Sequence, residues 1–262
     1  MDKEEYKLPI LDTLHKAIVT IADNTYVLSR SLFLPSIIIC LVLEGQKLLY
    51  QHFVASREYH YLIITTFATL IISPILAAMF AVTCHRIALL GKESLPNSFG
   101  IYLSRRELKY FGWVLLFGIP MGIGYMAVPI MTPLFMKSMD DPRAIILLLT
   151  QAWRLIGLVI ISFITAPFIL VLPATAIGEK RAFSTARLTV KGNIIRLAIV
   201  LIIPALITSL IGLALRHFGP EASNTPYDVI TYLIYLVFVV FQTVVLSISY
   251  KSLAYERLGN TY

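Results

Sequence analysis

Two ionisable side chains, Glu44 and Arg154, lie in or beside the long apolar runs of this sequence. An unpaired charge near the centre of a bilayer costs at least about 2.5 kcal/mol, so such residues are candidates for a functional site. One hypothesis is that Glu44 and Arg154 form an ion pair across two helices and line an outward-facing cavity. The alternative is that each charged group reaches the membrane surface, with Trp153 in an interfacial aromatic belt.

The sequence contains none of the familiar motifs for nucleophilic catalysis, metal binding or phosphate binding. There is no GxSxG, HExxH or P-loop, and the five histidines are not spaced as metal ligands. Cys40 and Cys84 lie in apolar runs without a CxxC, where a free thiol ordinarily serves as a small packing residue. We therefore predict no catalytic residue, no metal and no cofactor.

The third apolar run contains a cluster of residues that bend helices or bring them close together. The cluster consists of Gly118, Pro120, Gly122 and Gly124. Proline removes a backbone hydrogen bond, and glycine lets a neighbouring helix approach. Two interpretations stay open: a kinked packing helix, or a hinge that lines a cavity or gate.

Composition indicates what kind of protein must position these residues. Hydrophobic residues make up 58% of the 262 and charged residues 14%, against roughly 25% charged in a soluble domain. The apolar residues form six continuous runs: Ser31–Leu49, Tyr61–Leu89, Tyr110–Met131, Ile156–Ile177, Ile195–Leu215 and Tyr227–Tyr250. Each is near or above the ~20 residues that a helix needs to cross a bilayer. We predict an all-α integral membrane protein with six transmembrane helices in one membrane domain, residues 1–262.

The basic residues predict how the spans are oriented. Sixteen of the 22 lysines and arginines fall on one side of the predicted spans. The positive-inside rule then places both termini in the cytoplasm. The net charge of +7 is spread beside the apolar runs, so an anionic lipid surface explains it better than nucleic acid.

Three prolines at regular spacing predict an internal repeat. Pro35, Pro120 and Pro204 are 85 and 84 residues apart, and each lies in the first span of a two-span unit. Eleven residues before each proline is a polar residue: Asn24, Lys109 and Asn193. We predict three parallel repeats, residues 1–90, 91–177 and 178–262, each with an interfacial helix followed by a two-span hairpin. The alternative is a chance recurrence of prolines and basic loops.

The predicted interfacial helices combine an apolar face with basic residues. In the third copy Phe183 and Leu188 alternate with Arg187 and Lys191. Such a helix lies in the plane of the lipid headgroups. The candidate surface for anionic lipids, a membrane-protein partner or a second copy of the chain is Arg105, Arg106, Lys109, Lys180, Arg181, Arg187, Lys191 and Asn193.

The segment from Pro173 to Pro204 resembles the YciC-like family and the related membrane domain that accompanies some glycerophosphodiester phosphodiesterases. The positions that match are Pro173, Ala182, Ser184, Leu188, Thr189, Gly192 and Asn193. Two positions differ: Arg187 stands where the family often has tryptophan, and Val190 is inserted before Lys191. The resemblance implies a multi-pass protein of the bacterial inner membrane, and it carries over no catalytic residue.

Two functions from different classes fit these observations. The first is a non-enzymatic polytopic membrane protein that acts through protein partners or lipids in assembly, scaffolding or membrane homeostasis. The second is a small transporter or lipid-handling channel with a cavity near the third and fourth spans. A polar cavity that reaches the midplane would favour the second function, and a solidly packed bundle would favour the first.

Overall fold

The computed structural model describes residues 6–94, 103–118, 142–218 and 225–258. All the regular secondary structure in these residues is helical. The predicted all-α class is therefore confirmed for the part of the chain that the structure describes.

Among the described residues, four helices are long and apolar enough to cross a bilayer. They are α2 (Thr25–Ser56), α3 (Tyr59–Leu90), α8 (Ile194–Phe218) and α9 (Thr225–Leu258). Their apolar segments are Thr25–Ser56, Ile63–Leu90, Ile194–Leu215 and Tyr227–Ala254. At ~1.5 Å per residue, the 32 residues of α2 extend about 48 Å, so this helix continues beyond a ~30 Å hydrocarbon core.

The other two predicted spans are described only in part. The third, Tyr110–Met131, is helical up to residue 118, and its remainder lies outside the described residues. The fourth, Ile156–Ile177, ends earlier than predicted: α5 covers Pro142–Ile169, and a separate short helix, α6, covers Val171–Ala176. Pro173 explains the break, because it has no N–H to donate to the carbonyl of Ile169. The count of six spans stays a prediction.

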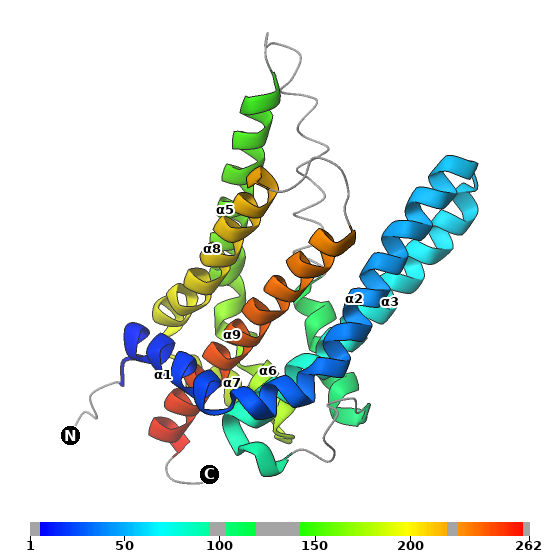
Figure 1. Cartoon of the computed structure of the whole chain (residues 1–262). Coiled ribbons are helices and arrows are strands. Elements are labelled where there is room, and N and C mark those ends of the chain that lie inside the picture. Colours follow the sequence, from blue (N-terminus) through cyan, green and yellow to red (C-terminus); the bar gives the residue numbers. More distant parts are fainter. Residues whose placement is uncertain (1–5, 95–102, 119–141, 219–224, 259–262) are drawn as a thin grey trace, which may run out of the picture.

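The long helices diverge from a common base (Figure 1). The α2–α3 hairpin projects to one side, α5 and α8 pack together on the other, and α9 lies between them and contacts α2, α3 and α8. At the base lie α1 (Ile10–Asp23), α6 and α7 (Ala182–Val190). We call these three short helices, with the adjoining ends of the long helices, the basal layer.

The main buried cluster lies where the basal layer meets the long helices. It includes Leu170 of the α5–α6 link, Leu197 of α8 and Tyr250 of α9. Away from the base, the long helices expose large apolar side chains such as Leu70 and Leu210. This exposure of large apolar side chains fits a lipid environment, because the hydrophobic effect would oppose it in water.

The order of elements can be compared in two of the three predicted repeats. A short basal helix precedes a pair of long helices in α1–α2–α3 and again in α7–α8–α9. In the middle unit, residues 105–118 are helical, but residues 95–102 and 119–141 lie outside the described parts. The threefold repeat therefore stays a prediction.

Candidate functional site

Helix α7 buries mainly small side chains and exposes Leu188 together with basic residues. Its small residues Ala182 and Ala186, together with Val190, are buried at a spacing of four residues. Leu188 is 62% exposed, and Arg187 and Lys191 beside it are exposed as well. This is the reverse of a soluble amphipathic helix, whose large apolar residues face the core.

Aromatic stacking fixes α7 against its neighbours. Phe183 stacks on Trp113 from the helix at residues 105–118, with ring centroids 5.7 Å apart, and on Phe168 of α5 at 5.6 Å. A Cβ added at Gly178 would lie 3.7 Å from Nε of Arg106, so the start of the helix at 105–118 lies beside the link before α7. The structure therefore brings together the two basic segments that the sequence places about 75 residues apart.

Most of the predicted basic surface is exposed. Arg106 is half-buried, and the exposed members are Arg105, Lys109, Lys180, Arg181, Arg187 and Lys191. The prediction is wrong for Asn193, because this residue is only 1% exposed and cannot belong to the basic surface.

The side chain of Asn193 instead holds the N-terminal segment. Its Oδ1 accepts a hydrogen bond from the backbone N–H of Leu8 at 2.7 Å, and its Nδ2 donates to the carbonyl of Tyr6 at 2.7 Å. Arg196 donates to the carbonyl of Leu8 at 3.1 Å. We call these three hydrogen bonds the N-terminal clasp. They leave Leu8 fully buried against the base.

A glycine positions the clasp. Gly192 connects α7 to α8 with φ of 81°, a conformation that costs glycine little and other residues more. Asn193 follows it, and its carbonyl accepts from Leu197 at 2.8 Å in the first turn of α8. The Gly192–Asn193 pair thus has a structural role, and its partners 185 residues away could not be read from the sequence.

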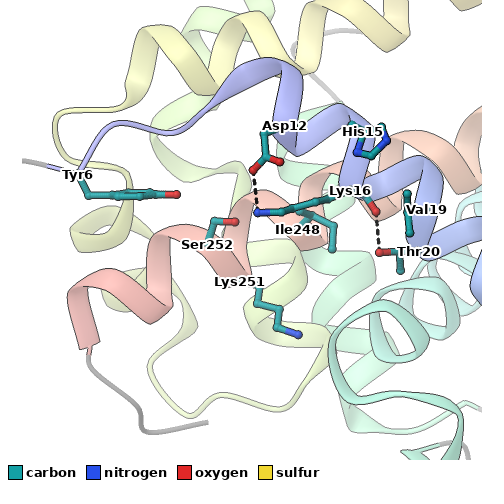
Figure 2. A pocket seen from close by; sticks show the side chains of 9 residues that line it. All are labelled: Tyr6, Asp12, His15, Lys16, Val19, Thr20, Ile248, Lys251 and Ser252. Carbon is teal, nitrogen blue, oxygen red and sulfur yellow. Dashed lines mark hydrogen bonds and ion pairs between the residues drawn. The ribbon is translucent and has the colours of Figure 1, made fainter.

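A pocket of about 660 Å³ opens between α1 and α9 (Figure 2). On the α1 side, Lys16 Nζ forms an ion pair with Asp12 at 2.7 Å. The Asp12 carboxylate raises the pKa of Lys16 through this hydrogen bond and through its charge. On the α9 side, Lys251 and Ser252 line the pocket. We call this the basal pocket. The sequence indicates it only through Lys16 and Lys251, which are among the sixteen basic residues on one side of the predicted spans.

A buried polar cluster joins three helices just above the base. His85 of α3 lies 2.7 Å, through Nδ1, from Oγ of Ser247 of α9. Its Nε2 lies 3.1 Å from the hydroxyl of Tyr110 in the helix at residues 105–118. All three side chains are buried. Satisfied hydrogen bonds among buried groups favour a packing role for this cluster.

Glu44 has partners that the sequence analysis did not identify. Its Oε1 accepts from Lys47 Nζ at 2.9 Å, and Lys47 also bonds Asp228 at the start of α9. Glu44 is 7% exposed, and its Oε2 has no hydrogen-bond partner among the described residues. The i,i+3 spacing of Glu44 and Lys47 could have signalled this pair. Arg154 lies on α5 but its side chain is outside the described part, so the Glu44–Arg154 pair stays a prediction.

The predicted hinge is described at one position only. Gly118 is the last described residue of its helix, and a Cβ added there would meet no described atom within 4 Å. Close helix packing within the described residues therefore does not require glycine at this position. Pro120, Gly122 and Gly124 lie outside the described residues, as does the second half of the third span, beside which a cavity was predicted.

Among the described residues, no group of three or more His, Cys, Asp or Glu side chains could hold a metal ion. Comparison of the chain with protein-family models, with curated proteins and with solved structures gives no match. The resemblance to the YciC-like family therefore stays a prediction, and the site has to be interpreted from its own geometry.

Proposed function

We propose that this chain is a non-enzymatic multi-pass membrane protein that acts at the cytoplasmic face by binding anionic lipids, in membrane homeostasis or in the assembly of a membrane partner. The observation that carries this proposal is the outward face of α7, where exposed Leu188 stands beside exposed Arg187 and Lys191. The interface of an anionic membrane accepts both kinds of side chain at once.

Helix α1 supports the same interpretation. It buries the small residues Thr13 and Ala17, while Leu11 is 79% and Ile18 is 56% exposed. Lys16 is exposed on the same helix. Two basal helices that lie far apart in the sequence thus combine exposed apolar and basic side chains. Lipid at the level of the basal layer would cover the apolar groups and neutralise the basic ones.

The proposal is tested by neutralising the outward charges of α7. In the double variant Arg187→Gln/Lys191→Gln, the affinity of the purified full chain for phosphatidylglycerol should fall by about fivefold to thirtyfold, because each basic residue near an anionic surface contributes about 1 kcal/mol. Native mass spectrometry of lipid retention measures this affinity. Lys92→Gln, an exposed lysine at the base but outside α7, is the matched control and should change it little. Equal retention of phosphatidylcholine and phosphatidylglycerol by the unaltered chain would refute the proposal.

The proposal also requires that the basal layer face the cytoplasm. The beginning of α1 and the end of α9 lie at the same end of the bundle (Figure 1), which fits an even number of crossings. A reporter that is active only in the cytoplasm, fused after Tyr262, should therefore be active. A second reporter, of a kind that is active only outside the cytoplasm, should be active when it is inserted after Arg57 in the α2–α3 turn. If both reporters were inactive, the basal layer would lie outside the cytoplasm, which would contradict the proposal.

A further inference from the structure

The basal pocket lies where a membrane-spanning helix meets a basal helix. Its α9 wall consists of Ile248, Lys251 and Ser252, which lie in the last two turns of the apolar segment Tyr227–Ala254. Its α1 wall includes Val19 as well as Asp12 and Lys16. The pocket therefore has apolar lining close to basic and hydroxyl groups, and its volume of about 660 Å³ falls in the roughly 300–1,000 Å³ range of ligand sites.

The polar groups of the pocket can neutralise an anion and donate hydrogen bonds to it. Lys16 and Lys251 line opposite walls of the pocket, and Ser252 supplies a hydroxyl. In Figure 2 the ammonium group of Lys251 extends away from Lys16, and its flexible four-carbon stem lets it turn toward a bound anion. In Figure 2 the ring of Tyr6 points toward Ser252, with its hydroxyl at the end nearer to Ser252. Among the described residues Lys251 has no ion-pair partner. Thr20 is already committed, because its hydroxyl donates to the carbonyl of Lys16 at 2.7 Å.

Asp12 competes with any anion for Lys16. Its carboxylate lies 2.7 Å from Lys16 Nζ inside the same pocket, as the dashed line in Figure 2 marks. The two side chains are about half exposed, so the ion pair is in contact with solvent and exchanges readily. An anionic ligand would therefore displace Asp12 from Lys16, and removal of the Asp12 charge would favour the ligand.

We propose that the basal pocket binds the phosphate group of an anionic glycerophospholipid. Lys16 and Lys251 neutralise the phosphate, Ser252 donates a hydrogen bond to it, and Val19 and Ile248 contact the start of the acyl region. This inference rests on the proposed function, since it requires the base to lie at a lipid surface, and it adds one defined site to that surface. The N-terminal clasp holds Tyr6 and the start of α1 in place, so the site depends on it.

The test measures binding of phosphatidylglycerol to the purified full chain by native mass spectrometry. Lys16→Gln/Lys251→Gln should lower the affinity about tenfold or more, because two cationic contacts are lost. Asp12→Asn should raise it by about twofold to fivefold, because a competing exposed carboxylate is removed. A misfolded variant cannot produce this gain. Lys92→Gln is again the matched control.

The outcomes separate this inference from the function on which it rests. If the pocket variants leave phosphatidylglycerol binding unchanged while Arg187→Gln/Lys191→Gln lowers it, the pocket inference fails and the proposed function stands. If neither set of variants changes binding, both fail. Glycerol 3-phosphate is the soluble comparison. If it binds the unaltered chain as tightly as phosphatidylglycerol does, and responds to the same variants, the pocket recognises a soluble phosphate ester and the lipid assignment is overturned.

Discussion

Replacement of Asn193 with alanine is expected to release the N-terminal segment from the base. The substitution removes two hydrogen bonds and leaves the N–H of Leu8 and the carbonyl of Tyr6 without their partner. A buried polar group that loses its partner costs about 1–3 kcal/mol, so the two groups together would cost the segment roughly 2–6 kcal/mol of its docking free energy. Burial of Leu8 contributes only about 1.5–3 kcal/mol in the opposite direction.

Limited proteolysis with trypsin measures this release at Lys7, which lies within the clasped segment. The rate of cleavage after Lys7 should rise at least tenfold in Asn193→Ala, while cleavage elsewhere is unchanged. Asn193→Asp keeps the acceptor for Leu8 but loses the donor to Tyr6, so its rate should be intermediate. Asn24→Ala is the matched control, because Asn24 occupies the corresponding place before Pro35, but its side-chain amide donates to the carbonyl of Thr20 in the preceding helix, at 2.9 Å. Equal cleavage rates in the unaltered chain and Asn193→Ala would contradict the clasp.

The second large effect is expected at Lys47, which holds two carboxylates together. In Lys47→Gln, Glu44 and Asp228 would both keep a negative charge without the lysine that joins them. Removal of one partner from a buried pair costs about 3–5 kcal/mol, and the lower end applies because Lys47 and Asp228 are about a quarter exposed. Thermal unfolding in one detergent should show a clearly lower midpoint than that of the unaltered chain.

Compensating variants distinguish this explanation from a general defect. Glu44→Gln alone should be mild, because Lys47 keeps Asp228, and Glu44→Gln/Lys47→Gln should recover most of the stability lost in Lys47→Gln. A double variant no more stable than Lys47→Gln would count against the triad. If Glu44 pairs instead with Arg154, Lys47→Gln should be mild, and simultaneous charge reversal of Glu44 and Arg154 should rescue either single reversal.

For helix α7, the sequence predicts the helix itself but not which of its residues are buried. The alternation of Phe183 and Leu188 with basic residues correctly predicts a helix with an apolar and a basic character. It does not predict which residues pack inward, because Ala182, Ala186 and Val190 are equally consistent with a helical period of 3.6. Tertiary packing settled the rotation of the helix by stacking Phe183 between Trp113 and Phe168.

The sequence by itself determined the helical class and located four helices that are long and apolar enough to cross a membrane among the described residues; the six spans that it predicts stay a prediction. It also placed most of the basic residues on one side of the apolar runs. These properties follow from local hydropathy, from run length and from the position of charges next to each run. The tertiary structure alone decided that Asn193 holds Tyr6 and Leu8, that Lys47 joins Glu44 to Asp228, and that α1 and α9 enclose a pocket. Each of these contacts joins segments more than 180 residues apart, and their geometry depends on how helices cross and rotate, which a local pattern does not encode.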